Sequence, residues 1–245
     1  MKYSNLTIEN PNFLKRFSHQ SRFIEAGKLL EKYKSLEKFS LLDFGSGDGY
    51  FIKFLKEKKF FFDFNAYDAD PEEKQIIEMK NLFKNNNIKD VGIYNEFKKI
   101  DKKFNFITCL ETLEHFNEED QTKILNQIKS LLKEDGRIII SVPIEVYLSG
   151  FAKMIFRFLV NQNHENTSIK NLFKTLFGIP IIENLNDKFL STHEMNYKST
   201  HVGFYYFNLI SLIKKMGFKI EEIKFSPFPF LSSIFNSQIL LKIKI

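Results

Sequence analysis

The most constraining feature of the sequence is a glycine-rich turn that follows a short apolar run. Residues 41–50 are Leu-Leu-Asp-Phe-Gly-Ser-Gly-Asp-Gly-Tyr, so that Gly45, Gly47 and Gly49 stand at alternate positions. Glycine lets the backbone turn sharply and lets a ligand approach within contact distance. The pattern predicts a strand that ends in a ligand-binding turn and is followed by a helix.

Two classes of nucleotide cofactor bind at such a turn. A dinucleotide fingerprint requires glycine or alanine at position 50, where this chain has Tyr50. Asp43 and Asp48 flank the turn, and carboxylates are unfavourable beside a pyrophosphate. An adenosyl ligand with an amino group, a sulfonium and no phosphate tolerates them. The turn therefore favours such a ligand over NAD, and a tight turn that binds no ligand is the structural explanation that competes with both.

Around this turn, short apolar runs alternate with longer amphipathic segments. The runs are 39–44, 60–67, 91–94, 104–110 and 137–142, and the helical segments between them are 50–58, 71–85 and 118–133. Asp70-Pro71 is typical of a helix start and Asp135-Gly136 of a helix end. Buried strands that alternate with helices predict a parallel sheet in an α/β fold.

The remaining segments complete one domain over residues 1–245. An amphipathic helix is expected at 20–34, within an N-terminal segment 1–38, ahead of a cofactor-binding core at 39–143. Residues 144–200 contain helical pieces at 151–160 and 168–177 and are too long for an ordinary connection, so we expect a lid or substrate-binding insertion. Its aromatic residues, such as Phe151, Phe156 and Phe158, are expected to pack inward or to shield the site. Residues 201–245 are expected to form a helix at 204–216 and strands at 218–225 and 237–245.

Two further polar signals follow predicted strands. Asp68 comes about 20 residues after the glycines, where a carboxylate can accept hydrogen bonds from both ribose hydroxyls. Asp70 is better explained as the N-cap of the next helix. Residues 110–115 follow the fourth strand, at the sheet edge where ligands of doubly wound folds bind.

Taken in order, these segments resemble the class I S-adenosylmethionine-dependent methyltransferases. The similarity is greatest to the branch with ubiquinone/menaquinone-biosynthesis and small-molecule O-methyltransferases. It rests on the glycine motif 41–50, Asp68, Glu-Thr-Leu-Glu-His at 111–115, Gly-Arg-Ile-Ile-Ile-Ser-Val-Pro at 136–143, His-Val-Gly-Phe at 201–204 and Gly217-Phe218. The insertion at 144–200 has no counterpart in this resemblance.

The resemblance implies a doubly wound, Rossmann-like seven-stranded sheet of order 3-2-1-4-5-7-6, with the last strand antiparallel. It also implies that S-adenosylmethionine is the cofactor. The three glycines would lie beneath the methionine part, Asp43 near its amino group, and Asp68 at the ribose. Asn95 or Glu96, at the end of the third strand, would contact the adenine. The reactive end would lie over Leu110 and Glu111.

A hydroxyl acceptor gains from a base that removes its proton, and histidine suits this near neutral pH. The candidate bases are His115 in the acidic loop, and His193 and His201 beside the polar segment 194–200. A structural role competes with catalysis for each of them, since a lone histidine more often braces a loop. His19 and Arg22 could line the site from the N-terminal helix, but an exposed face of that helix is the favoured expectation for both.

Charge and composition limit the classes of binding partner that the sequence supports. The formal net charge of +6 comes almost entirely from lysines that alternate with acids, which favours a solvated surface over a nucleic-acid site. The single cysteine, Cys109, cannot form an internal disulfide, and no metal-ligand cluster is visible. No signal peptide or membrane span is apparent, so the sequence predicts a soluble cytoplasmic protein.

The sequence thus predicts a methyltransferase that acts on a small molecule, most simply at oxygen. The lysine-rich surface is compatible with a phosphorylated or nucleotide-linked acceptor, such as a sugar intermediate of surface glycan synthesis. A quinone precursor is its nearest rival. The same residues are also compatible with an RNA methyltransferase, and with a cofactor-binding protein of this fold that has no activity.

Overall fold

The computed structural model describes residues 11, 13–34, 39–69, 73–159, 168–181, 189–192, 195–198 and 201–245. The predicted helix start at Asp70-Pro71 and the candidate base His193 lie outside these residues.

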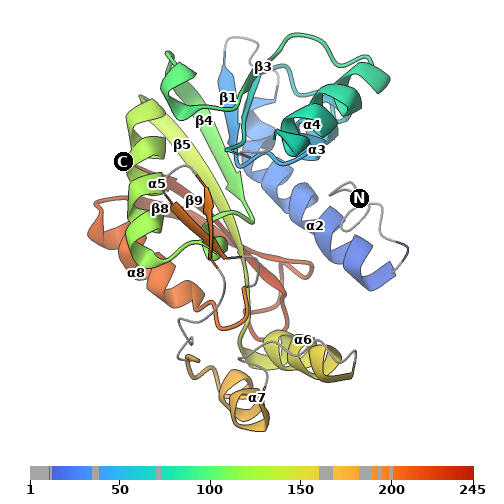
Figure 1. The fold of residues 1–245 in the computed structure, drawn as a ribbon, viewed down its shortest axis with the longest axis vertical. Coiled ribbons are helices and arrows are strands. Elements are labelled where there is room, and N and C mark those ends of the chain that lie inside the picture. Colours follow the sequence, from blue (N-terminus) through green and yellow to red (C-terminus); the bar gives the residue numbers. More distant parts are fainter. Residues whose placement is uncertain are drawn as a thin grey trace.

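A seven-stranded sheet forms the centre of the molecule (Figure 1). Its strands are β1 (Ser40–Phe44), β2 (Asp63–Tyr67), β3 (Val91–Tyr94), β4 (Phe104–Leu110), β5 (Leu132–Pro143), β8 (Lys219–Ser226) and β9 (Gln238–Lys244). The strand order is β3-β2-β1-β4-β5-β9-β8. Strands β1 to β5 pair in parallel, whereas β9 runs antiparallel to both β5 and β8. Counted along the chain, this is the predicted order 3-2-1-4-5-7-6 with its last strand reversed, so the predicted fold class is confirmed.

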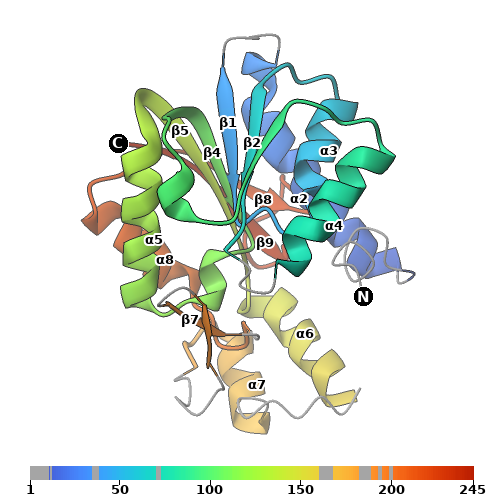
Figure 2. The same ribbon diagram turned by 45° about the horizontal axis from the view of Figure 1, so that its top comes forward.

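Helices cover both faces of the sheet (Figure 2). One layer contains α2 (Phe13–Leu30), α3 (Tyr50–Glu57) and α4 (Lys74–Asn85), and the other contains α5 (Glu118–Leu131) and α8 (Tyr206–Lys215). Neighbouring residues of one strand enter opposite cores, because side chains alternate along a strand. Leu41 packs with the layer of α2 to α4, and Leu42 packs with that of α5 and α8. The sheet is therefore buried on both faces, as the unbroken apolar runs predict.

The helix end predicted at Asp135-Gly136 is wrong. The helix expected over 118–133 ends at Leu131, and Asp135-Gly136 lies inside β5 rather than at a helix end. Leu132 pairs with Phe104, and the next pair joins Phe106 to Arg137. The register of β5 against β4 is therefore irregular between residues 132 and 137. Asp135 and Gly136 lie in this irregular part of the strand and not in a turn after the helix.

The insertion, residues 144–200, follows the carboxyl end of β5 in the chain, and its described helices lie at one end of the molecule (Figures 1 and 2). It contains α6 (Tyr147–Leu159), α7 (Ile169–Leu176) and a hairpin of β6 (Phe189–Thr192) and β7 (Met195–Lys198). The sequence predicts the two helices but not the hairpin. Phe156 and Phe158 are exposed, so the prediction that they pack inward is wrong, and the prediction that they shield the site stays a prediction.

Candidate active site

The glycine turn joins β1 to α3 at the carboxyl edge of the sheet. Gly45, Gly47 and Gly49 have φ angles of 76°, 55° and 79°, in the left-handed region that glycine adopts at little cost. The backbone N–H groups of Gly45 and Ser46 both donate to the Tyr67 carbonyl at the end of β2, at 2.8 and 3.0 Å. The turn is thus fastened to the neighbouring strand.

Close packing also requires glycine at position 45. A Cβ atom there would overlap the Thr112 hydroxyl oxygen and lie 2.8 Å from Thr112 Cγ2, in the loop that follows β4. The glycine turn and the loop after β4 therefore contact each other directly. These are the two segments that the sequence singles out for the cofactor.

Asp43 is buried beneath the turn and holds it in place. One carboxylate oxygen accepts a hydrogen bond from Thr108 Oγ1 at 2.6 Å and the other accepts from Ser46 Oγ at 2.9 Å. Burial raises the pKa of Asp43 to about 6, although both hydroxyl groups and Arg22 favour the charged form. Asp43 thus braces the loop, and its position near an amino group of the cofactor stays a prediction.

Asp68 and Asn95 lie at the carboxyl ends of the adjacent strands β2 and β3. Asp68 Oδ2 accepts the Gly47 N–H at 2.7 Å, which ties this carboxylate to the glycine turn. The Asn95 side chain donates to Glu73 Oε1 at 2.7 Å, just before α4. The structure brings Asp68 to the turn as the sequence predicts. The ribose and adenine roles of the two residues stay predictions.

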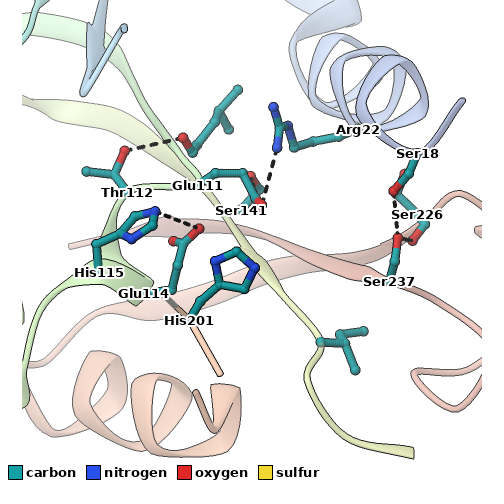
Figure 3. Close-up of polar contacts among 12 residues, drawn as sticks. Ser18, Arg22, Glu111, Thr112, Glu114, His115, Ser141, His201, Ser226 and Ser237 are labelled. Atoms are coloured by element: carbon teal, nitrogen blue, oxygen red, sulfur yellow. Dashed lines mark hydrogen bonds and ion pairs between the residues drawn. The ribbon is translucent and has the colours of Figure 1, made fainter. Parts of the chain in front are cut away.

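Leu110 and Glu111 mark the end of β4. Leu110 is buried, and Glu111 adopts a left-handed φ of 52°, which is uncommon for a residue with a side chain. The Glu111 N–H donates to the Ser141 carbonyl of β5 at 2.9 Å, and Ser141 Oγ lies 3.5 Å from Glu111 Oε1. The strained conformation directs the Glu111 side chain across the sheet edge toward α2 (Figure 3).

Arg22 meets Glu111 there, and its predicted place on an exposed helix face is wrong. The Arg22 side chain is 3% exposed, and its Nη1 lies 3.3 Å from Glu111 Oε2. Neither Nε nor Nη1 has a hydrogen-bond acceptor among the described residues. A sequence signal is present, because Arg22 precedes the fully buried Ala26 by one helical turn and so shares its face.

His115 and His201 come together from segments far apart in the sequence (Figure 3). Their ring centroids are 5.8 Å apart, and the His115 ring also stacks on Tyr197 of β7 at 4.8 Å. Glu114 lies beside them, with its Oε1 4.0 Å from His115 Nε2 (Figure 3). Its side chain is 1% exposed, and its Oε2 has no hydrogen-bond partner in the described structure. Burial, reinforced by the nearby Glu111, raises the pKa of Glu114 well above its ordinary range.

Glu145 connects this cluster to the insertion. Its carboxylate lies 2.9 Å from Lys153 Nζ, 2.8 Å from Arg157 Nη1 and 3.8 Å from His201 Nε2. Burial opposes ionisation of Glu145, yet these cations outweigh it and lower the pKa to about 2. Gly150 makes this approach feasible, because a Cβ there would overlap the Glu145 backbone carbonyl.

His201 itself is held toward its neutral form. Desolvation lowers the pKa of His201, and the attraction of Glu145 only partly opposes this. His201 Nδ1 is buried and has no hydrogen-bond partner among the described residues, while 37% of the side chain is exposed. A neutral imidazole with an unused nitrogen can accept a proton.

The described residues contain no group of three or more histidine, cysteine, aspartate or glutamate side chains that could hold a metal ion. Among them, no helix is both long and apolar enough to cross a membrane.

The profile of a methyltransferase domain matches residues 13–223. The chain belongs to this family. It is a class I S-adenosylmethionine-dependent methyltransferase, which confirms the cofactor and the enzyme class that the sequence predicts. The narrower branch stays a prediction. No curated protein sequence matches the chain.

Solved methyltransferase structures share the fold. An S-adenosylmethionine-dependent methyltransferase from Clostridium acetobutylicum is 17% identical with a TM-score of 0.59, over 99% of this chain and 96% of that one. Magnesium protoporphyrin IX methyltransferase from Synechocystis PCC 6803, with bound SAH, is 13% identical with a TM-score of 0.58, over 95% and 87%. The glycopeptide N-methyltransferase MtfA, complexed with sinefungin, is 9% identical with a TM-score of 0.57, over 91% and 93%. At these identities the similarity concerns the fold.

Proposed function

We propose that this methyltransferase acts at a hydroxyl group of a small acceptor, enclosed by the insertion, and that His201 removes the hydroxyl proton. We place it in the branch of ubiquinone/menaquinone-biosynthesis and small-molecule O-methyltransferases. The proposal rests on His201, which lies beside His115 at the carboxyl edge of the sheet. Its lowered pKa favours the neutral imidazole, and its Nδ1 has no hydrogen-bond partner among the described residues.

The methyl donor site is proposed at the ends of β1, β2, β3 and β4. Its residues are Asp43, Gly45, Gly47, Gly49, Asp68, Asn95, Leu110 and Glu111, with Arg22 added from the structure. The buried Arg22 atoms without acceptors suit the carboxylate of a methionine moiety. Asp68, on the strand next to the glycine turn, suits two ribose hydroxyls. When bound, S-adenosylmethionine supplies a methyl group activated by its sulfonium.

The acceptor site is proposed at His115 and His201, on the side of Glu111 opposite the methyl donor site. His115 stacks on Tyr197, which supports a positioning role for His115 and leaves proton removal to His201. Glu145 lies 3.8 Å from His201 Nε2, so it can stabilise the imidazolium that forms when His201 takes the proton. His193 lies outside the described residues and stays a predicted candidate base.

Charge pairing favours an acceptor without phosphate. Lys153 and Arg157, the cations nearest the histidines, both engage the Glu145 carboxylate. A phosphate would have to compete with that buried carboxylate for them. We therefore propose a neutral hydroxylated acceptor, which suits a quinone precursor better than a nucleotide-linked sugar. The single cysteine, Cys109, supports a cytoplasmic location.

Turnover of the His201→Ala variant tests the proposal. A panel of phenols and catechols is offered with S-adenosylmethionine, and release of S-adenosylhomocysteine is measured. Loss of a general base should lower kcat about 100- to 1000-fold, while donor affinity stays unchanged. The wild-type rate should fall with acidification only below pH 6.5, because the pKa of His201 is lowered from that value.

His115→Ala serves as the matched variant. It should lower kcat less than His201→Ala and should leave the pH profile in place. Unchanged kcat in His201→Ala, or the same pH profile in that variant as in the wild type, would show that His201 is not the base.

A further inference from the structure

The insertion exposes large apolar side chains to solvent. Ile169 and Phe173 of α7, and Phe177 directly after its last residue, follow one another at four-residue spacing and are 69%, 56% and 70% exposed. Residues at this spacing share one helix face, so the apolar face of α7 points away from the protein. The neighbouring helix α6 and the residues after α7 add Leu148, Ile155, Phe156, Phe158, Leu159 and Ile179. We call this set the apolar face of the insertion.

A second exposed apolar segment lies close by. The loop between β8 and β9 exposes Phe228, Phe230, Leu231, Ile234 and Phe235, and Phe230 is 98% exposed. Lys153 of α6 donates to the Ser237 carbonyl at the end of this loop, at 3.3 Å. The loop and α6 therefore adjoin at the carboxyl side of the sheet (Figure 1). Monomeric proteins in water rarely expose so many apolar side chains together.

The cations beside the α7 part of this face are Lys170 and Lys174. Residues 146–159 and 168–181 contain no aspartate or glutamate, and their other two cations, Lys153 and Arg157, are paired with Glu145. Lys170 and Lys174 lie beside the stripe of Ile169, Phe173 and Phe177. Large apolar side chains on one face of a helix, with lysines beside them, are typical of helices that lie in a membrane interface.

The charge pattern also distinguishes between occupants. A symmetric dimer through this face would bring the same patch of two copies together, and so would oppose lysines with lysines. An anionic lipid surface offers the opposite charge to the lysines and an apolar interior to the phenylalanines. We propose that the apolar face of the insertion, with the β8–β9 loop, docks this methyltransferase on an anionic phospholipid membrane.

The docking face and the histidine cluster share α6. Lys153 and Arg157 of this helix hold Glu145, which contacts His201. Docking through α6 and α7 therefore brings the proposed acceptor site next to the lipid. The docking itself requires neither methyl donor nor acceptor, so it can be tested independently of the proposed function.

The test is flotation of the purified full chain with lipid vesicles. One set of vesicles contains phosphatidylcholine alone, and the other contains roughly one third phosphatidylglycerol. The wild type should float with the anionic vesicles and only weakly with the neutral ones. The double variant Phe173→Ser/Phe177→Ser should lose about tenfold or more in partitioning, because two apolar side chains no longer enter the lipid. Lys170→Gln/Lys174→Gln should lose about thirtyfold on anionic vesicles alone.

Phe61→Ser is the matched control. Phe61 is 53% exposed, much like Phe173, but it precedes β2 at the amino end of the sheet, away from the insertion. This variant should float as the wild type does. All variants should keep the wild-type melting temperature and affinity for S-adenosylhomocysteine, which shows that they are folded.

Three results would overturn the proposal. The first is a wild type that fails to float with anionic vesicles, and the second is a Phe173→Ser/Phe177→Ser variant that floats as well as Phe61→Ser. The third is a wild-type dimer in sedimentation that Phe173→Ser/Phe177→Ser abolishes, which would assign the face to a second copy of the chain.

Discussion

Two buried carboxylates at the same edge of the sheet are held in opposite ways. Asp43, on the glycine-turn side, accepts hydrogen bonds from Thr108 and Ser46, and its pKa is raised to about 6. Glu145, on the insertion side, is paired with Lys153 and Arg157, and its pKa is lowered to about 2. Burial alone raises the pKa of a carboxyl group, so the difference comes from the two cations that contact Glu145.

The comparison shows how the two sides are built. The glycine turn is formed by strand ends, left-handed glycines and hydrogen bonds without an ion pair, so its geometry is fixed by backbone and packing. The insertion is joined to the sheet by charges that come from α6, Glu145 and His201. We therefore expect the turn side to be sensitive to added volume and the insertion side to be sensitive to loss of charge.

The largest expected effect is that of Gly45→Ala. The added Cβ would overlap Thr112 Oγ1 and the residue would keep a φ of 76°, so both overpacking and strain oppose it. We expect a loss of about 4 kcal/mol in the free energy of unfolding, measured by urea denaturation. Gly217→Ala has a similar φ of 85° with open space around its Cβ, and should cost only about 1–2 kcal/mol. Equal losses for the two variants would contradict the tight contact between the turn and the β4 loop.

Glu145→Gln should have the next largest effect. At pH 7 it leaves Lys153 and Arg157 without their carboxylate and should lower the free energy of unfolding by about 3 kcal/mol. Because the folded pKa is below the ordinary value of 4.5, the Glu145 contribution is present above pH 4.5. It is lost as the pH falls toward 2, so the difference between wild type and variant should shrink over that range.

Glu222→Gln is the control for this prediction. Glu222 pairs with Lys242, and the Glu222 side chain is 39% exposed, so this carboxylate stays in contact with water. Solvation of the carboxylate weakens the pair, so this variant should lose less than about 1 kcal/mol at pH 7. A Glu145→Gln loss as small as that of Glu222→Gln would argue against the charge network.

Asp43→Asn tests the other carboxylate. Ionisation of Asp43 should lower the free energy of unfolding rather than raise it, and the expected effect is smaller than that of Glu145→Gln. Because the folded pKa of Asp43 lies above its ordinary value of 3.8, ionisation of Asp43 destabilises the folded state as the pH rises through about 4 to 6. The wild type should therefore gain about 2–3 kcal/mol relative to Asp43→Asn between pH 7 and pH 4. Urea unfolding at both pH values measures this, and a wild type that loses stability relative to the variant would contradict the assignment.

Much of the turn side could be predicted from the sequence, because local signals determine it. The bounds of β3 and β4 agree with the apolar runs 91–94 and 104–110 at both ends. The glycines and Asp68 meet because parallel strands bring their carboxyl ends to one edge. Turn chemistry is misleading at Asp135-Gly136, where pairing of Leu132 with β4 outweighs the local preference of those residues.

The insertion side could be predicted only in part. Its helices follow from periodicity, but strands of four residues, as in the β6–β7 hairpin, are too short for alternation to be distinctive. The pairing of Glu145 with Lys153, Arg157 and His201 depends on how α6 returns over β5, which no local pattern encodes. The burial of Arg22 escapes prediction for a related reason, since a charged residue on an amphipathic helix is ordinarily assigned to solvent.

The central claim is that the two sides have separate functions. Asp68 belongs to the glycine-turn side, which binds the methyl donor, and His201 belongs to the insertion side, which binds the acceptor. Calorimetric titration of S-adenosylhomocysteine into Asp68→Ala and His201→Ala tests it directly, with Asp63→Ala at the other end of β2 as the control. We predict about a hundredfold loss of affinity for Asp68→Ala and wild-type affinity for the other two. Wild-type affinity in Asp68→Ala, or a comparable loss in His201→Ala, would contradict the division.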